Sequence, residues 1–416
     1  MERIQIIADF DWLKQPEIVG ELGHERLRGS SIYSFSFAQT WLNQHKTFML
    51  SGDWNNYSGT QYKTNNIFSC ITDAMPDRWG RRLIDKRERL IADKERRLPR
   101  TLADFDYLLL LSDAARTGAF RFQKDGAFIG QDNEMPIPPL TDLREFVAMA
   151  HKYEQSDGVN GTIKEEWLNN LFRQGSSLGG TRPKACVRDE NGNLFIAKIP
   201  SNFDDYDVAL WEHFAHCMAK KIGINAAETR LLELDGVKYH TLLSKRFDRN
   251  REKRIHFASA MTLCNLHDGA DANSGNGYLD IVETIIGSAG IQNPSDNLKE
   301  LYRRVAFNIC IGNHDDHFRN HGFILTQNGW NFSPAYDLNP TNETTQSILI
   351  SRQTNESSLQ ELLAAHNDYF LTEKEAKNII DFVRQGMRQW QTVANQCRIS
   401  KSEQERFAKR FEVNLM

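Results

Sequence analysis

The sequence predicts an α+β fold with two lobes, the first rich in β-strands and the second mostly helical. Short alternating apolar runs at 4–7 and 33–37 are typical of strands. A Gly-rich turn at 175–184 leads into a second strand pattern at 194–199. Near the C-terminus, the apolar residues of two long segments recur with the helical period, in 298–311 and 374–393.

Three domains are expected from these patterns. They are a β-rich then helical N-terminal subdomain (1–130), a nucleotide-binding part (141–250) and a helical lobe with two polar loops (251–416). The first is expected to hold strands at 4–7, 33–37, 48–50 and 118–122 and helices at 78–93 and 102–111. The second is expected to hold helices at 143–153, 163–172 and 208–222 and strands at 194–199 and 238–247. Residues 130–140, rich in Pro, Gly, Asp and Asn, read as the linker between the first two.

Composition excludes several functional classes. The 416 residues are 40% hydrophobic and 25% charged, as in ordinary globular proteins. A net charge of −4 provides no overall attraction to nucleic acid, so a DNA contact would need a local patch or a partner. Six scattered cysteines without a CxxC pair indicate neither a disulfide framework nor a zinc knuckle. Without a long apolar window, no membrane contact is expected, and we expect a cytoplasmic protein.

The most informative motif is the segment 313–320, which reads NHDDHFRN and follows an apolar run. It places Asn320 five residues after Asp315, and Asp337 follows seventeen residues after Asn320, beyond another strand-like run. Protein kinases use this order for a catalytic base and two metal ligands. A carboxylate orients the attacking hydroxyl, and hard oxygen atoms hold Mg²⁺ against the phosphates. The spacing therefore predicts phosphoryl transfer with ATP and Mg²⁺.

A lysine and a glutamate extend this hypothesis. Lys198 stands in an apolar strand pattern, where burial without a partner would cost several kcal/mol. We expect it to reach a phosphate or the carboxylate of Glu212 on the next helix, although a snorkelling lysine and a surface glutamate are equally compatible. The Gly-rich turn is not a Walker A loop and, taken alone, is more typical of a tight hairpin. His317 is interpreted as packing its loop, and Asp316 as solvated and dispensable.

An alternative chemistry uses the same residues. The pairs His314-Asp315 and Asp316-His317 could bind metal as in an HD-type phosphohydrolase. That site needs further histidines on separate helices, and the candidates are His213, His216 and His267. This alternative leaves the Gly-rich turn, Lys198 and Asp337 without a role.

Several motifs, in order along the chain, resemble the HipA family of bacterial serine/threonine kinases, the toxins of type II toxin–antitoxin modules. The resembling segments are MPDRWGR at 75–81, GAFRF at 118–122, SLGGTRPK at 177–184, IAKIP at 196–200, KRFDR at 245–249, and the two polar loops at 313–320 and 336–337. The family usually has Glu where this chain has Lys245. The resemblance covers nearly the whole chain and implies a kinase-like fold.

The resemblance implies a role for each matching residue. Asp315 would be the catalytic base, Asn320 and Asp337 the Mg²⁺ ligands, and Lys198 a contact to the ATP phosphates. The nucleotide-binding candidates are Gly179, Gly180, Thr181, Arg182, Pro183, Lys184, Lys198, Lys245, Arg246, Phe247, His317, Asn320, Tyr336 and Asp337. Among these, 245–247 matches the segment that holds the adenine. Ser177 matches the serine that family members autophosphorylate, and Ser176 is an additional candidate.

The resemblance also implies partners. Family members phosphorylate aminoacyl-tRNA synthetases, notably glutamyl-tRNA synthetase, and thereby arrest translation. They are neutralised by a small helix-turn-helix antitoxin, HipB, so DNA would be contacted only through that complex. A second hypothesis is a catalytically dispensable co-repressor that acts by binding such an antitoxin.

Overall fold

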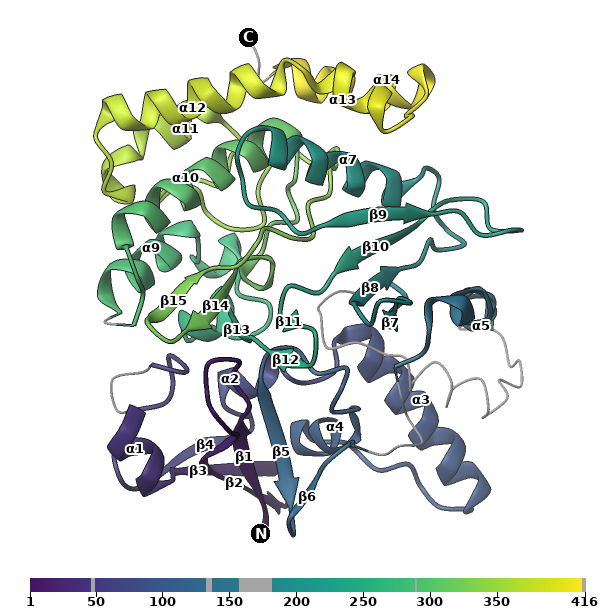
Figure 1. The fold of residues 1–416 in the computed structure, drawn as a ribbon, viewed down its shortest axis with the longest axis vertical. Coiled ribbons are helices and arrows are strands. Elements are labelled where there is room, and N and C mark those ends of the chain that lie inside the picture. The colour runs from purple at the N-terminus through teal and green to yellow at the C-terminus, as the bar shows by residue number, and fades with distance from the viewer. Residues whose placement is uncertain (46–48, 132–136, 157–181, 289, 414–416) are drawn as a thin grey trace. The chain divides into compact units, whose positions relative to one another are not determined.

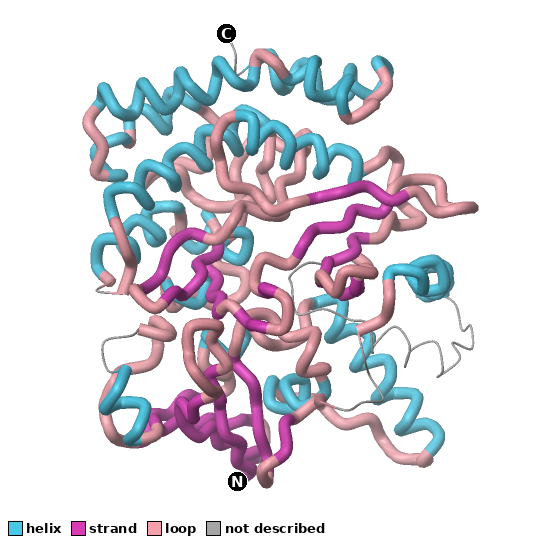
Figure 2. Tube along the Cα trace, viewed as in Figure 1, coloured by secondary structure: helices cyan, strands magenta, loops and turns pink. Residues whose placement is uncertain are grey.

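The computed structural model describes residues 1–45, 49–131, 137–156, 182–288 and 290–413 (Figure 1). The chain divides into two compact units, which are treated separately below. Unit 1 contains residues 1–204 and 243–258, and unit 2 contains residues 205–242 and 259–416. Most strands belong to unit 1 and most helices to unit 2 (Figure 2).

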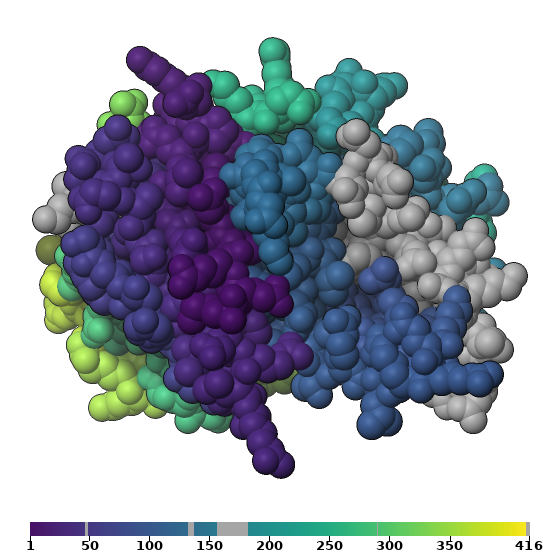
Figure 3. Space-filling view, turned by 90° about the horizontal axis from the view of Figure 1, so that it is seen from below, coloured from purple at the N-terminus to yellow at the C-terminus, as the bar shows by residue number. Residues whose placement is uncertain are grey.

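Unit 1 begins with a six-stranded antiparallel sheet of order β4-β3-β2-β1-β5-β6. Its strands are β1 (Glu2–Ala8), β2 (Glu17–Leu27), β3 (Ser30–Phe37), β4 (Thr60–Thr64), β5 (Phe120–Lys124) and β6 (Ala127–Phe128). Ile6 pairs with Phe122, so residues near 120 (blue) lie beside the N-terminal strand (purple) on the face shown in Figure 3. Phe35 and Trp54 stack at 3.9 Å between ring centroids within the core of this unit.

The other elements of unit 1 are mainly helices and short strands. They are α1 (Gln39–His45), α2 (Ser69–Thr72), α3 (Arg78–Lys94), α4 (Asp104–Leu110), η1 (Leu140–Asp142), α5 (Leu143–Ser156), β7 (Lys184–Arg188), β8 (Leu194–Lys198), β11 (Arg249–Asn250) and β12 (Lys253–Arg254). Asp77 begins α3 by accepting a hydrogen bond from the Gly80 amide at 2.7 Å. In the next sheet β8 lies between β7 and β10 (Thr241–Lys245).

Unit 2 is built mainly of helices, apart from β9 (Thr229–Leu232) and the hairpin of β14 (Gly322–Thr326) and β15 (Gly329–Phe332). Strand β13 (His256–Ser259) contains the boundary between the units. The helices are α7 (Val208–Lys221), α8 (Ala260–Leu263), η2 (Ala272–Ser274), α9 (Tyr278–Gly287), α10 (Pro294–Ile311), η3 (Phe318–Asn320), α11 (Leu359–Ala364), η4 (His366–Tyr369), α12 (Glu373–Met387), α13 (Trp390–Gln396) and α14 (Lys401–Val413). Buried α10 is the central helix and packs against α12 (Figure 1).

Most elements predicted from periodicity are present, with three differences. Met49 and Leu50 are not in a strand, and Phe48 lies outside the described residues, as does the helix expected at 163–172. The expected helix 374–393 is two helices, because α12 ends at Met387 and α13 begins at Trp390. Strand β2 was not predicted. Gly20 and Gly23 interrupt the alternation of apolar and polar residues that is typical of a strand. Gly20 is nevertheless needed in the sheet, because a Cβ at this position would lie 2.3 Å from the Ser36 carbonyl oxygen.

No helix in the described part of the chain is long and apolar enough to cross a bilayer.

Two sequence motifs of unit 1 meet at a buried carboxylate. Asp248 accepts hydrogen bonds from the Gly118 amide at 2.8 Å and from Arg246 Nη2 at 2.7 Å. Arg246 and Arg249 also each donate to the Arg116 carbonyl oxygen at 2.6 Å. Burial alone would raise the pKa of Asp248, but Arg246 and Arg249 lower that pKa below its ordinary value. Asp248 therefore joins the 245–249 motif to the strand motif at 118–122.

We predict that Asp248→Ala lowers the free energy of unfolding by about 3–5 kcal/mol, because two buried guanidinium groups lose their carboxylate. Urea denaturation measures this. Glu21→Gln is the control, because its ion pair with Arg3 is exposed and is expected to contribute at most about 1 kcal/mol. Equal effects of the two substitutions would contradict a structural role for Asp248.

Candidate functional site

The first polar loop of unit 2 begins where α10 ends. Gly312 adopts a left-handed conformation (φ 73°), and its amide donates to the Asn308 carbonyl oxygen. A Cβ at this position would lie 2.9 Å from the Arg410 side chain. Glycine therefore ends the helix and directs 313–317 away from the α10 axis, before η3 begins at Phe318.

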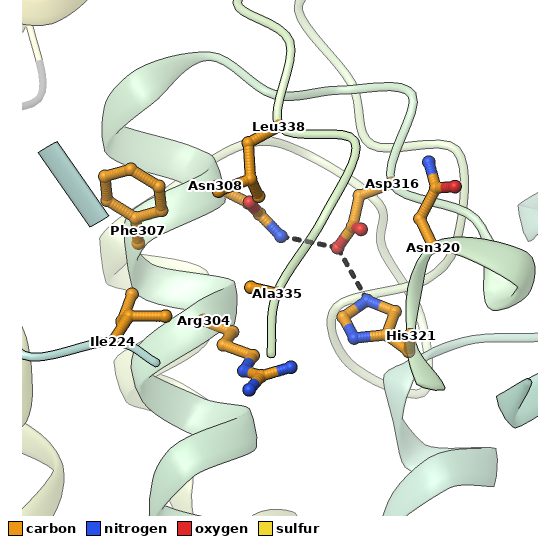
Figure 4. A pocket seen from close by; sticks show the side chains of 9 residues that line it. All are labelled: Ile224, Arg304, Phe307, Asn308, Asp316, Asn320, His321, Ala335 and Leu338. Atoms are coloured by element: carbon orange, nitrogen blue, oxygen red, sulfur yellow. Dashed lines mark hydrogen bonds and ion pairs between the residues drawn. The ribbon is translucent and has the colours of Figure 1, made fainter. Parts of the chain in front are cut away.

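The Asp316 carboxylate is the hub of this loop (Figure 4). Its Oδ2 accepts hydrogen bonds from Asn308 Nδ2 at 2.5 Å, Tyr278 Oη at 2.6 Å and His321 Nε2 at 2.8 Å. Burial alone would raise the pKa of Asp316, but the His321 ring and the Tyr278 hydroxyl lower it below its ordinary value. Asp316, Asn308 and His321 line a small pocket together with Asn320.

The interpretation of Asp316 as solvated is therefore wrong, and its three hydrogen bonds argue against its being dispensable. Asp316 is 2% exposed, whereas its neighbour Asp315 is exposed. The backbone of Asp315 is nevertheless fixed, because its carbonyl oxygen accepts from Asn320 Nδ2 at 2.9 Å and from the His317 amide at 3.2 Å. The loop thus presents one carboxylate outward and buries the next.

The second polar loop follows β15 and is tied to the first. Tyr336 Oη donates to the Arg319 carbonyl oxygen at 2.5 Å. Asp337 adopts a left-handed conformation (φ 57°), which is uncommon for a residue other than glycine and is frequent at functional sites. Its Oδ1 accepts from Asn339 Nδ2 at 2.8 Å, and the Asn339 amide donates to Asn313 Oδ1 at 3.4 Å.

The donor set of these loops fits a hard cation such as Mg²⁺. Asn320 is buried and uses its Nδ2 in the bond to Asp315, which leaves the amide Oδ1 as a ligand atom. Asp337 adds a carboxylate, and Mg²⁺ prefers such oxygen ligands. Within the described ranges, Asn339 Oδ1 and His317 Nδ1 are buried without a hydrogen-bond partner. Such orphaned polar atoms are typical of places where a ligand or ordered water binds.

The predicted residues of unit 1 are described by themselves. Lys198 ends β8, is half-buried and pairs in register with Lys184. Lys184 is 3% exposed, and its Nζ lies 3.2 Å from Asp77 Oδ2. Arg182 forms a two-pronged hydrogen bond with Asp204, and the Pro183 carbonyl oxygen accepts from the Ile199 amide. The candidates Ser176, Ser177, Gly179, Gly180 and Thr181 lie outside the described residues.

In the segment expected to hold adenine, the polar groups of Arg246 already form structural hydrogen bonds. The Arg246 guanidinium is buried against Asp248, and its backbone amide donates to the Leu194 carbonyl oxygen at 2.9 Å. Arg246 is thus occupied on both its side chain and its N–H. Lys245 and Phe247 on either side are half-buried.

The geometry of unit 2 disfavours the metal phosphohydrolase alternative. Both ring nitrogens of His314 bond to hydroxyl groups, Nδ1 to Thr341 Oγ1 at 2.9 Å and Nε2 to Ser357 Oγ at 3.2 Å. His216, another histidine of unit 2, is buried on α7. Its Nε2 lies 3.8 Å from Oε1 of Glu212, which is buried on the same helix. The expected Lys198–Glu212 pair stays a prediction, because its members belong to different units.

The chain is similar to a known domain family and to proteins named as kinases. A model of the HipA-like C-terminal domain matches residues 176–391. The chain is 26% identical over 185 residues to a protein from Haemophilus influenzae named "Putative kinase", covering 40% of this chain and 53% of that one. It is 28% identical over 241 residues to "Putative kinase Y4dM" of Sinorhizobium fredii, covering 54% and 56%. The chain therefore spans about half the length of these relatives.

A structural likeness extends over the whole fold. A chain from the solved complex of the toxin–antitoxin system HipA, HipB and its operator DNA from Shewanella oneidensis MR-1 matches with a TM-score of 0.69. The match covers 99% of this chain and 96% of that chain at 17% identity. The predicted α+β, two-lobed kinase-like fold is thereby confirmed.

The fold is of the kinase-like class. The domain match covers more than half of the sequence, and the chain belongs to the HipA family.

We predict that Asp316 contributes to the stability of the fold and that its neighbour Asp315 does not. Asp316→Ala should lower the free energy of unfolding by about 3 kcal/mol or more, because three buried donors lose their acceptor. Asp315→Ala should change it by at most about 0.5 kcal/mol, as for other exposed positions. Urea denaturation of both variants is the measurement. A smaller loss in Asp316→Ala than in Asp315→Ala would overturn the assignment of Asp316 as the hub.

The stability of the folded chain should depend on pH through His314. Burial, and secondarily Arg410, lowers the pKa of His314 from 6.5 to about 4. Between pH 6.5 and about 4, the unfolded chain therefore binds a proton at His314 that the folded chain does not. The contribution of His314 to the free energy of unfolding is complete above pH 6.5 and falls as the pH decreases toward 4. His314→Gln should lose less unfolding free energy than the parent on acidification over this range. The exposed His267→Gln is the control and should follow the parent.

Proposed function

We propose that this chain is an ATP-dependent protein serine/threonine kinase that acts as a HipA-type toxin. The observation that carries the proposal is the pair of loops in unit 2, in which Asp315 is exposed while Asn320 and Asp337 are held by hydrogen bonds. The family match and the relatives named as kinases support the same chemistry.

Each residue of the two loops has a specific proposed task. Asp315 accepts the proton of the attacking hydroxyl, and its backbone is fixed by Asn320 and His317 so that the carboxylate faces outward. Asn320 and Asp337 would hold Mg²⁺, which when bound neutralises charge on the phosphates. The buried ring nitrogen of His317 is a candidate contact to the same nucleotide.

The nucleotide contacts in unit 1 are proposed for Lys198 and for the backbone of 179–184. The Lys184 side chain is a poor candidate for phosphate, because it is buried in its ion pair with Asp77. Lys198 is the half-buried lysine of the neighbouring strand and remains the proposed phosphate contact. Arg246 is assigned to structure rather than to adenine, and the backbone of Lys245 and Phe247 stays the proposed contact to the base.

We propose an aminoacyl-tRNA synthetase as the substrate and a HipB-like helix-turn-helix protein as the neutralising partner. The structural likeness to a chain from a HipA, HipB and operator DNA complex supports the second assignment. DNA would then be contacted only through the partner, and a cytoplasmic location would follow. Autophosphorylation at Ser177, or at Ser176, would place almost two negative charges beside the phosphate site and would inhibit ATP binding.

The second candidate is a catalytically dispensable co-repressor that works by complex formation. The structural likeness alone is compatible with it, because a fold does not determine activity. The fixed polar loops favour the kinase, since a scaffold has no need for Asp315, Asn320 and Asp337 on two joined loops.

We predict that Asp315→Ala and Asp337→Ala each lower the rate of phosphate transfer from radiolabelled ATP in Mg²⁺ by about two to four orders of magnitude. The loss arises because one variant lacks the proton acceptor and the other a metal ligand. The substrates are the chain itself and a bacterial lysate. Asp368→Ala is the control, because its ion pair with Arg352 lies on the surface of the same unit.

The same samples separate the two candidates. Parent-level labelling in both folded loop variants would contradict the kinase assignment. Antitoxin binding that persists while no variant or parent transfers phosphate would favour the co-repressor. Mass spectrometry of the parent protein, compared with Asp315→Ala, tests phosphate at Ser176 and Ser177 independently of the kinase assignment.

A further inference from the structure

Two cysteines and a histidine meet in unit 2 between α7 and the end of α13. His213 and Cys217 are four residues apart on α7 and therefore share one helix face. Cys397 follows α13 directly as its C-terminal cap residue. The helices α7 and α13 pack against each other (Figure 1). Residues separated by 180 positions in the sequence thus form one cluster.

The spacing of the three side chains is close to that of a metal site. His213 Nε2 lies 3.6 Å from Cys217 Sγ, and the three potential ligand atoms all lie within 4.8 Å of one another. Tetrahedral zinc has bonds of about 2.0–2.3 Å, which place neighbouring ligand atoms about 3.5–4 Å apart. A small side-chain adjustment is enough to bring Cys397 into this range. In the described part of the chain, no other group of three such residues is comparably close.

The histidine of the cluster is oriented for ligation. Its Nδ1 forms a 2.8 Å hydrogen bond with Thr229 Oγ1 on β9, which directs Nε2 toward Cys217. Metal-binding histidines commonly have such a partner on the second ring nitrogen. All three residues are half-buried, so the cluster is protected but reachable from solvent.

We propose that His213, Cys217 and Cys397 bind one zinc ion, with the fourth position taken by water or an external ligand. Thiolate and imidazole donors select zinc over Mg²⁺, so this site is distinct from the oxygen donors of the two polar loops. Binding replaces the thiol protons, which pass to the solvent, by bonds to the metal. The ion would join α7 to the α13–α14 turn and reinforce the aromatic contact of Trp211 with Phe407 (4.7 Å between centroids).

The test uses the full chain, kept reduced, stripped with a chelator and supplied with excess Mg²⁺ to occupy any oxygen site. Addition of Co²⁺ should produce a thiolate-to-metal charge-transfer band at one equivalent, which Zn²⁺ then abolishes. Competition with a chromophoric chelator gives the zinc affinity and stoichiometry. Absence of the cobalt–thiolate band in the reduced parent protein would overturn the proposal. If Cys217 and Cys397 are instead isolated as a disulfide, failure to take up zinc after reduction would also overturn it.

Matched variants locate the site. Cys217→Ser and Cys397→Ser should each weaken zinc binding more than tenfold, and Thr229→Val should weaken it about 10- to 100-fold through the orientation of His213. Cys264→Ser is the control, because Cys264 is also half-buried in unit 2 but bonds to Thr284. Equal zinc affinity in Cys217→Ser and Cys264→Ser would refute the assignment.

A further measurement needs no variant and remains decisive if a substitution disturbs folding. Zinc should slow alkylation of Cys217 and Cys397 in the parent protein, as quantified by mass spectrometry, and leave Cys264 unaffected. Unchanged alkylation rates of both cluster cysteines in the presence of zinc would refute the proposal, whatever the outcome of the kinase assays.

Discussion

The buried charge of Asp316 constrains the polar loops of unit 2 more than any other group. A carboxylate removed from water costs several kcal/mol unless donors surround it. Tyr278 from α9, Asn308 from α10 and His321 just before β14 supply these donors, so three elements must converge on one oxygen. Because Asp316 is held inward, Asp315 beside it faces outward. The orientation of the proposed catalytic base therefore depends on a residue that takes no part in the chemistry.

Neutral amides carry this constraint to the second loop. Asn308 Oδ1 accepts from Asn313 Nδ2 at 3.1 Å, Asn313 bonds to the backbone of Asn339, and Asn339 bonds to Asp337. Amides can donate and accept at once, and they avoid the desolvation cost of further charges. The helix end, the Asp315 loop and the Asp337 loop are therefore one connected network. Asp337 can keep its left-handed backbone because its surroundings hold it there.

The sequence predicts the elements whose signal is local and misses those decided by distant contacts. The local pattern identifies α10 and β8. Motif spacing groups Asp315, Asn320 and Asp337, whose shared chemical role stays a prediction. Nothing local distinguishes Asp315 from Asp316, because the burial of Asp316 depends on Tyr278, 38 residues away. The break between α12 and α13 contains neither Pro nor Gly, so the pattern reads as one helix. Asn308 and Asn339 could have been suspected only as polar residues beside the motifs.

Motif membership also does not separate structural residues from chemical ones. Arg246 and Lys184 stand in two motifs of unit 1, yet both side chains are buried in ion pairs with Asp248 and Asp77. Conversely, the cluster of His213, Cys217 and Cys397 belongs to no motif, since its members meet only when α7 packs against α13. Unit 2 thus contains two donor sets of opposite character. The oxygen atoms of its polar loops are the hard donors that Mg²⁺ prefers, and the sulfur atoms of the cluster are the soft donors that zinc prefers. The two proposed sites would therefore not compete for the same ion.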